Sequence, residues 1–96
     1  MKIEILPEAG ADLDNGYWFY ERQTSGLGEY FLTSVIADIR SLQLFAGIHI
    51  KYREKYRMLA SRFPFAIYYL VDGEIIRIYA VLDNRRNPDL RRERLR

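Results

Sequence analysis

The sequence has no cysteine, and this absence excludes a disulfide framework, a thiolate zinc site and a cysteine nucleophile. A single histidine, His49, excludes an all-histidine metal site. No apolar run approaches the roughly 18–20 residues of a membrane-spanning helix, and the first residues do not have the pattern of a secretory signal. We therefore expect a soluble, cytoplasmic domain that binds no membrane, metal or cofactor.

What the chain does have is apolar material and an uneven charge distribution. Its 96 residues fit one domain, and 49% of them are hydrophobic. Residues 1–48 contain three basic and seven acidic residues, a net charge of −4. Residues 49–96 contain twelve basic and six acidic residues, a net charge of +6. The second half is therefore expected to build a basic surface, for which nucleic acid and an acidic protein segment are both suitable partners.

The first half predicts one short strand and two helices. Apolar and polar residues alternate over residues 1–6, which favours a strand, and Pro7 suits the first position of a helix. Apolar residues then recur at helical spacing over residues 8–23 and again over 27–45. The polar break between them, residues 23–28, is so short that the helices are expected to form an antiparallel hairpin.

The second half changes to a period of two. Residues 48–55 are expected to form a connection with some strand content, and strands are expected over 56–62, 66–71 and 75–82. Asp72-Gly73 lies between two apolar runs and is a strong hairpin signal, because a type I′ turn needs positive φ at both central residues.

This turn predicts a hairpin register that pairs Tyr69 with Ile76. The face directed at the helices then carries Ile67, Tyr69, Ile76, Ile78 and Ala80. The opposite face, expected to be open to solvent, carries Tyr68, Arg77, Tyr79 and Val81.

The chain ends in an arginine-rich segment. Pro88 suits a helix start, and Leu90 and Leu95 are the only apolar residues after it, so we expect a short basic helix or a frayed tail. The element order is β-αα-βββ. The fold class predicted for residues 1–96 is a single α+β domain, with a small, mostly antiparallel sheet of three or four strands packed on a helical hairpin and followed by the basic tail.

Arginine is the residue type that stands out as a candidate for binding. The guanidinium group suits both phosphate and carboxylate, and tyrosine beside it can stack on bases, so RNA, an acidic protein segment or mere solvation of an exposed face all remain open. His49 is interpreted as a packed loop histidine, and no catalytic residue and no metal ligand is assigned. The candidate binding residues are Arg57, Arg62, Arg77, Tyr79, Arg85, Arg86, Arg91 and Arg92.

One stretch resembles a known family. Residues 59–71, Leu-Ala-Ser-Arg-Phe-Pro-Phe-Ala-Ile-Tyr-Tyr-Leu-Val, and residues 75–88, ending Ala-Val-Leu-Asp-Asn-Arg-Arg-Asn-Pro, are similar to the signature of ParE-type toxins in the RelE/ParE superfamily. Residues 5–13 resemble the first strand and helix start of that family. The resemblance implies the β-αα-βββ fold and a toxin of a type II toxin–antitoxin module, such as a plasmid stabilisation system, in a hetero-oligomer with its cognate antitoxin.

The superfamily has two branches with different targets. RelE-like members are ribosome-dependent mRNA endoribonucleases, whereas ParE-like members act on DNA gyrase and are not nucleases. Arg57 and Arg85 match basic positions of the nuclease branch, but Leu59, Ala66 and Arg91 stand where that branch carries catalytic side chains. The resemblance therefore favours growth arrest through gyrase, with the endoribonuclease as the alternative.

A third alternative is an inactive relative that only binds antitoxin. Two departures from the family pattern are present, and the second of them raises this alternative. Asp83 stands where many relatives carry histidine. Gly10 and Gly16 lie in the first predicted helix, where relatives carry helix formers, and each is expected to weaken that helix by about 1 kcal/mol relative to alanine.

Overall fold

The computed structural model describes residues 1–96 and confirms the α+β fold class, with a helical hairpin packed on a sheet. It adds a two-residue strand before the last three strands. Of the two expectations for the C-terminal segment, a short helix or a frayed tail, it shows the helix. The elements are β1 (Lys2–Ile5), α1 (Pro7–Glu21), α2 (Leu27–Phe45), β2 (Lys51–Tyr52), β3 (Lys55–Leu59), β4 (Phe65–Asp72), β5 (Ile75–Asp83) and α3 (Pro88–Arg94).

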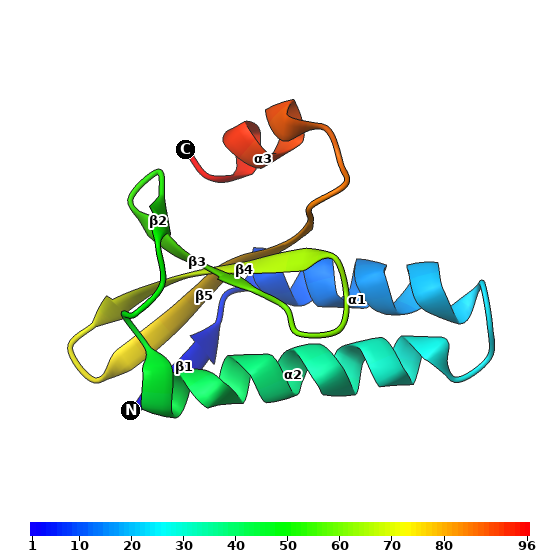
Figure 1. The fold of residues 1–96 in the computed structure, drawn as a ribbon, viewed down its shortest axis with the longest axis horizontal. Helices are drawn as coiled ribbons and strands as arrows, with labels where there is room; N and C mark the ends of the chain where they lie inside the picture. Colours follow the sequence, from blue (N-terminus) through cyan, green and yellow to red (C-terminus); the bar gives the residue numbers. More distant parts are fainter.

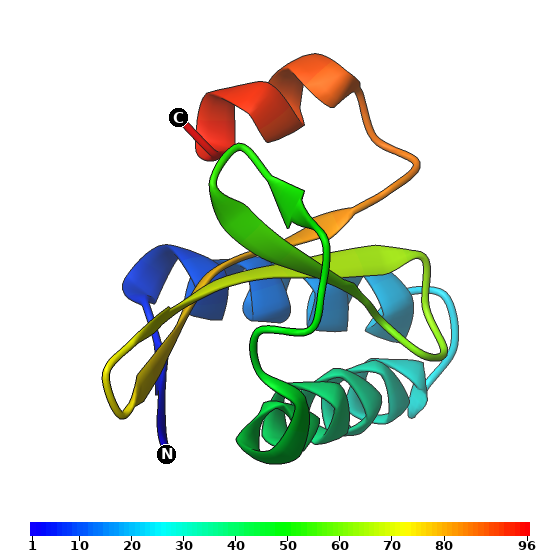
Figure 2. The same cartoon turned by 60° about the vertical axis from the view of Figure 1, so that its left-hand side comes forward.

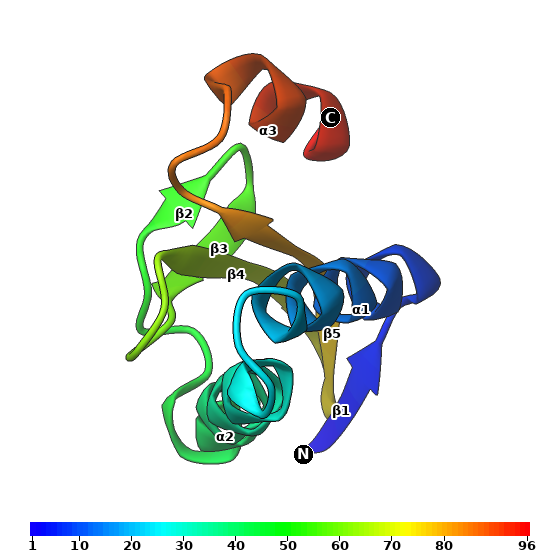
Figure 3. The ribbon, with the colours of Figure 1, turned by 90° about the vertical axis from the view of Figure 1, so that its right-hand side faces the viewer.

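The five strands form one mixed sheet in the order β1-β5-β4-β3-β2. β1 is parallel to β5, and the other neighbouring strands are antiparallel. The α1–α2 hairpin lies on one side of the sheet and α3 lies on the other (Figures 1 and 3). The molecule therefore has three layers, and the C-terminal helix is one of them.

A single carboxylate fixes the turn of the helical hairpin. Glu21, the last residue of α1, accepts hydrogen bonds from the backbone N–H groups of Gly26 and Gly28 at 3.0–3.1 Å. These N–H groups lie at the start of α2, where backbone donors have no partner within the helix. The acid thus acts as a cap across the turn and explains why so short a connection is stable.

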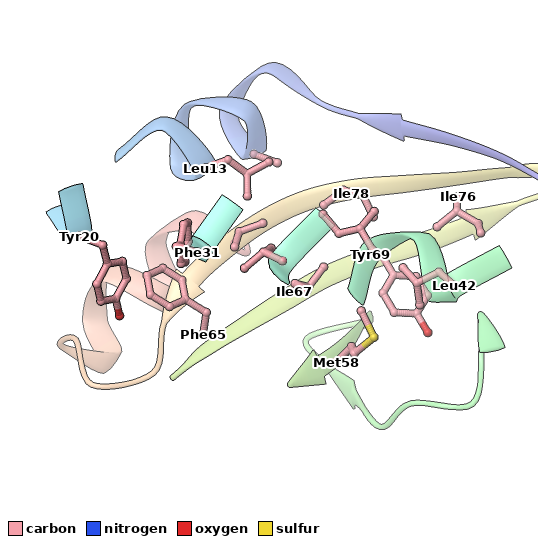
Figure 4. Close-up of a cluster of buried hydrophobic side chains, with 14 residues drawn as sticks. Leu13, Tyr20, Phe31, Leu42, Met58, Phe65, Ile67, Tyr69, Ile76 and Ile78 are labelled. Carbon is pink, nitrogen blue, oxygen red and sulfur yellow. The ribbon is translucent and has the colours of Figure 1, made fainter. Parts of the chain in front are cut away.

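The main core lies between the helical hairpin and the sheet (Figure 4). α1 and α2 contribute one stripe each, and β4 and β5 contribute alternate residues. At one end of this core Tyr20 stacks on Phe63, and Phe31 and Phe65 pack against these rings at tilted angles. The buried residues are Ala9, Leu13, Tyr20, Phe31, Val35, Ile39, Leu42, Met58, Phe65, Ile67, Tyr69, Ile76, Ile78 and Val81.

The turn between β4 and β5 lies one residue later than predicted, so each β4 residue near the turn pairs two positions further along β5. Asp72 pairs with Ile75, so the two turn residues are Gly73 and Glu74, and Tyr69 pairs with Ile78 rather than Ile76. Gly73 has φ +59°, as expected, but Glu74 has no positive φ. A turn with glycine at its first central position is the type II′ pattern, which competes with type I′ in two-residue hairpins. The type I′ prediction was therefore wrong.

A β-bulge in β5 corrects the predicted faces. Tyr68 pairs with Ala80 while Tyr69 pairs with Ile78, so Tyr79 is an extra residue without a partner on β4. The extra residue reverses the alternation of side chains beyond it. Val81 therefore points into the helix-side core, and Ala80 points to the opposite face, each the reverse of the prediction.

Gly16 is a poor helix former, but its lack of a side chain lets α1 pack closely against α2. It is buried where α1 crosses α2, and a Cβ added there would lie 2.5 Å from the Phe31 ring. A real Cβ cannot approach that closely, so the glycine permits the helices to meet over Phe31. Gly10 differs, because nothing lies within 4 Å of the same added atom.

These two glycines form a matched pair for a stability test. We predict that Gly16→Ala lowers the free energy of unfolding by about 1–3 kcal/mol, because the methyl group overpacks the Phe31 contact. Gly10→Ala should raise it by up to about 1 kcal/mol, because alanine is the better helix former and the site has room. Urea denaturation of both variants measures the difference; equal effects of the same sign would contradict this account of Gly16.

Candidate functional site

The second face of the sheet is covered, not open as predicted. α3 crosses above it, close to the β2–β3 hairpin (Figure 2). Leu95, directly after α3, is 1% exposed and packs on Tyr68, which is fully buried. Ala66 and Ala80 complete this small cluster. The small side chains of the two alanines leave room for α3 to approach the sheet. The alternation of residues along one strand does not reveal that a helix covers it.

An ion pair attaches α3 to the first helix. The Asp12 carboxylate accepts hydrogen bonds from Arg94 Nη1 at 2.7 Å and Nη2 at 2.8 Å. The same carboxylate accepts the Val81 N–H at 2.9 Å. Val81 lies just beyond the residues of β5 that pair with β1, which end at Ile78, so its N–H has no partner in the sheet. One acid therefore joins α1, β5 and α3.

Local sequence explains why α3 forms at all. The Asn87 side chain caps the helix by accepting the Asp89 N–H at 2.8 Å, and Pro88 occupies the first helical position. Three arginines lie in the last turn, where positive charge is favoured by the helix dipole. The hydrogen bonds that Arg94 donates to the Asp12 carboxylate raise the pKa of Arg94, so this side chain is charged at any physiological pH.

Arginine and tyrosine side chains form a cluster where α3 meets the second face of the sheet. We call it the Tyr52 cluster, and its residues are Tyr52, Arg57, Tyr68, Asn84 and Arg91 of α3. Arg57 donates hydrogen bonds to the Tyr68 hydroxyl at 3.1 Å and to Asn84 Oδ1 at 3.0 Å. The Arg91 guanidinium lies over the Tyr52 ring, 5.2 Å from its centre. Arg91, together with Arg53, lowers the pKa of the Tyr52 hydroxyl. The cluster thus combines two guanidinium groups with a phenol whose pKa is lowered.

A cleft of about 540 Å³ runs between α1, the end of β5 and α3. Phe19 and Leu90 line it and are 41% and 55% exposed. Arg22 and Arg86 also line it, and neither makes an ion pair. Its acids are engaged, because Asp12 binds Arg94, Asp83 binds Arg85 and Glu93 binds Arg96. The cleft therefore presents apolar surface beside two free cations.

The eight candidate binding residues do not form one surface. The structure brings Arg57 and Arg91 together in the Tyr52 cluster and places Arg86 at the α1–α3 cleft. Arg62 lies apart, beside α2, where it donates a hydrogen bond to the Tyr30 hydroxyl at 3.1 Å. Arg77 is held by Glu4 at 3.1 Å and Asp72 at 2.7 Å.

The remaining candidates have partners within the chain. The Lys55 ammonium lies over the Tyr79 ring, 4.8 Å from its centre. Arg92 pairs with Asp89 on the exposed side of α3. Arg85 binds Asp83 at 2.8 Å and thereby lowers the pKa of that carboxyl. Asp83, the departure from the family pattern, thus serves to hold the arginine that follows it.

Sequence reasoning missed four residues that shape these sites: Asp12, Arg22, Tyr52 and Arg94. Arg94 carried one local signal, since the Asn87-Pro88 start of a helix predicts that the residues after it are ordered rather than frayed. Asp12 and Arg94 are 82 positions apart, and no spacing rule connects them. Tyr52 lay in a segment of mixed pattern that was interpreted only as a connection.

His49 has the structural role expected of it. The Tyr69 hydroxyl is hydrogen-bonded to His49 Nδ1 and accepts the Gly47 N–H at 2.9 Å. Burial lowers the pKa of His49 and raises the pKa of Tyr69, so both are neutral near pH 7. No group of three or more metal-ligating side chains is gathered anywhere in the chain. None of its helices combines the length and apolar character needed to cross a membrane.

Comparison with known proteins identifies the fold. No protein-family model matches the sequence, and no curated protein matches it. Among solved structures, the chain is similar to a chain of the "Chromosomal ParDE TA system from P. aeruginosa", with a TM-score of 0.77 and 22% sequence identity. The alignment covers 84% of this chain and 92% of that chain. The chain therefore has a ParE-like fold, as the sequence resemblance implied.

The ion pair that holds α3 can be tested against an exposed pair on the same helix. We predict that Arg94→Met lowers the free energy of unfolding by about 2–4 kcal/mol, because it leaves the buried Asp12 carboxylate without its cation. Arg92→Met removes an exposed pair and should change it by less than about 1 kcal/mol. Thermal unfolding of both variants makes the comparison, and a harmless Arg94→Met would show that α3 is held in another way.

Proposed function

We propose that this chain is the toxin of a type II toxin–antitoxin module and is neutralised by a cognate antitoxin protein. The observation that carries the proposal is the ParE-like fold shared with a chain of a ParDE toxin–antitoxin system over 84% of the present chain. The signature residues quoted above run from the end of β3 through β4 and β5 to the start of α3. The strongly basic second half suits a partner with an acidic segment.

The α1–α3 cleft is the part of the surface that best fits such an antitoxin segment. Phe19 and Leu90 offer apolar contact, and Arg22 and Arg86 are free to bind carboxylates. Arginine binds carboxylate in a bidentate manner that adds both energy and direction. An amphipathic, acidic segment would therefore place an apolar side chain in the cleft and its carboxylates at the rim.

We further propose that growth arrest proceeds through binding to DNA gyrase rather than through message cleavage. At two positions where the nuclease branch carries catalytic groups, this chain has side chains that cannot act on phosphate or protons. Leu59 is apolar and exposed on β3, and Ala66 is fully buried beneath α3. At the third, Arg91 is occupied with Tyr52. Loss of one well-placed group costs about 10²–10³ in rate, so several losses leave little activity.

One observation favours the alternative, ribosome-dependent mRNA cleavage. In the Tyr52 cluster, a phenol with a lowered pKa lies beside Arg91, and Arg57 lies on the same face. A phenol and two guanidinium groups could serve as proton donor and phosphate ligands. Arg91 belongs to α3, so this set of groups exists only while that helix stays in place.

The two modes of action predict different outcomes when the chain is expressed without antitoxin. We expect growth arrest with filamentation and an induced DNA-damage response, and inhibition of gyrase supercoiling by the purified chain. Tyr52→Phe removes the phenolic proton and should leave the arrest unchanged. Cleavage of ribosome-bound message that is abolished by Tyr52→Phe would establish the alternative, and the absence of any arrest would indicate an inactive relative.

A charge-reversal experiment tests the proposed antitoxin cleft. We predict that Arg22→Glu combined with Arg86→Glu weakens binding of the antitoxin, encoded beside the toxin gene, by at least about tenfold, since both cations would then repel its carboxylates. Arg40→Glu is the matched control, because Arg40 is exposed on α2 and makes no ion pair. Calorimetric titration gives the affinities, and equal affinities for all three proteins would remove the cleft from the interface.

A further inference from the structure

The outer edge of β1 carries backbone groups that nothing in the chain pairs. β1 lies at the border of the sheet, with β5 on one side only (Figure 3). Lys2 N–H donates to the Glu74 carbonyl at 2.7 Å, and Leu6 N–H donates to the Ile78 carbonyl at 3.1 Å. Backbone direction alternates along a strand, so the N–H and C=O groups of Ile3 and Ile5 point outward. They are free to pair with another strand.

The opposite border of the sheet is closed in a way that β1 is not. β2 covers the start of β3, and Arg57 N–H on β3 donates to the Ile50 carbonyl at 2.9 Å. Just after β3, the Asp38 carboxylate of α2 accepts the Ser61 N–H at 2.9 Å. Proteins commonly protect edge strands with a proline, a bulge or a covering segment. Within β1 there is no proline and no bulge.

The side chains of β1 have charges that suit a strand of the same sequence. Lys2 is exposed and makes no ion pair. Glu4 binds Arg77 through Oε1 at 3.1 Å, while its Oε2 accepts no hydrogen bond and the side chain is 43% exposed. On the other face of the strand, Met1 and Ile5 are exposed apolar residues. β1 thus presents Lys2 without an ion-pair partner, Glu4 with one carboxylate oxygen unbound, and the exposed apolar side chains of Met1 and Ile5.

We propose that two copies of this chain associate through their β1 strands, which pair antiparallel with Ile3 opposite Ile3 of the second copy. The outward N–H and C=O groups of Ile3 then bond reciprocally, as in a hydrogen-bonded antiparallel pair. Lys2 of each copy lies opposite Glu4 of the other, and Met1 lies opposite Ile5. The two five-stranded sheets become one continuous sheet, and both open edges are removed.

The charges select this register over its neighbours. Only registers that place outward-facing residues opposite each other use the free backbone groups, so the next possible registers differ by two positions. A shift in one direction places Glu4 opposite Glu4, and a shift in the other places Lys2 opposite Lys2. Like charges directly opposite each other are destabilising, whereas opposite charges stabilise the pair. Self-association of this kind uses none of the antitoxin-cleft residues and is independent of the proposed function.

The antiparallel register predicts an unusual pattern of complementation. Sedimentation equilibrium of the chain without an N-terminal tag should show a weak, concentration-dependent dimer, because a single strand pair is a small contact. Lys2→Glu and Glu4→Lys should each weaken self-association at least about tenfold, since each places like charges opposite each other twice. An equimolar mixture of the two variants should restore dimerisation as a heterodimer.

Two further proteins keep the test interpretable. Arg40→Glu changes an exposed charge away from β1 and should dimerise like the unmodified chain. Ile3→Pro removes an outward N–H that takes no part in the sheet; it should abolish dimerisation while circular dichroism remains that of the folded protein, since edge positions tolerate proline. It therefore replaces Glu4→Lys as the decisive variant if loss of the Arg77 contact unfolds that chain. A monomer up to millimolar concentration, or a mixture no better than either variant alone, would overturn the proposal.

Discussion

The Asp12 carboxylate is the point on which the three layers of this molecule depend. It accepts hydrogen bonds from the two terminal nitrogens of Arg94 and from the backbone N–H of Val81. One side chain of α1 therefore holds both the end of β5 and the C-terminal helix. The Val81 N–H is available because β1 has already ended and the bulge at Tyr79 has turned the strand. The bulge at Tyr79, the acid Asp12 and the cation Arg94 are distant in sequence, but together they connect β5, α1 and α3. We call this set of contacts the Asp12 joint.

The joint decides what the second face of the sheet can do. With α3 in place, Tyr68 and Ala66 are buried, and the partly buried Arg57 and Arg91 contact tyrosine side chains. The same position of α3 creates the α1–α3 cleft. Because Asp12 is bound to Arg94, Arg22 and Arg86 in this cleft have no ion-pair partner. A buried ion pair gains little over an apolar contact of equal size, but it is directional. Here the Asp12–Arg94 ion pair fixes the position of α3, and that position determines both the covered face of the sheet and the α1–α3 cleft.

The sequence was most informative where the residues within one helix or hairpin are enough to determine its structure. Helical spacing predicted α2 with its observed bounds, and the apolar runs around Gly73 predicted the β4–β5 hairpin and the positive φ at that glycine. The turn type was missed because Asp72-Gly73 and Gly73-Glu74 are both possible central pairs, and only tertiary packing decides between them. The bulge at Tyr79 was missed because nothing in an alternating run marks an extra residue.

The candidate site was harder to predict, because it is assembled from contacts between distant segments. Arginine enrichment located the basic half of the chain, but it could not show that Arg94 is used internally while Arg86 is free. Gly16 was interpreted as a weakness of helix one, although it is the contact point with Phe31. In each case the missing information was the identity of the partner, which lies on another element.

The measurement that tests this account most directly is amide hydrogen exchange at Val81, followed by NMR in the unmodified protein. Val81 lies beyond the strand pairing with β1, so its N–H is protected only if the Asp12 carboxylate holds it. We expect Val81 to exchange through global unfolding, with the same protection as Ile78 in the centre of the sheet. Rapid exchange at Val81 while Ile78 remains protected would contradict the central claim, since α3 would then be held without the joint at Asp12.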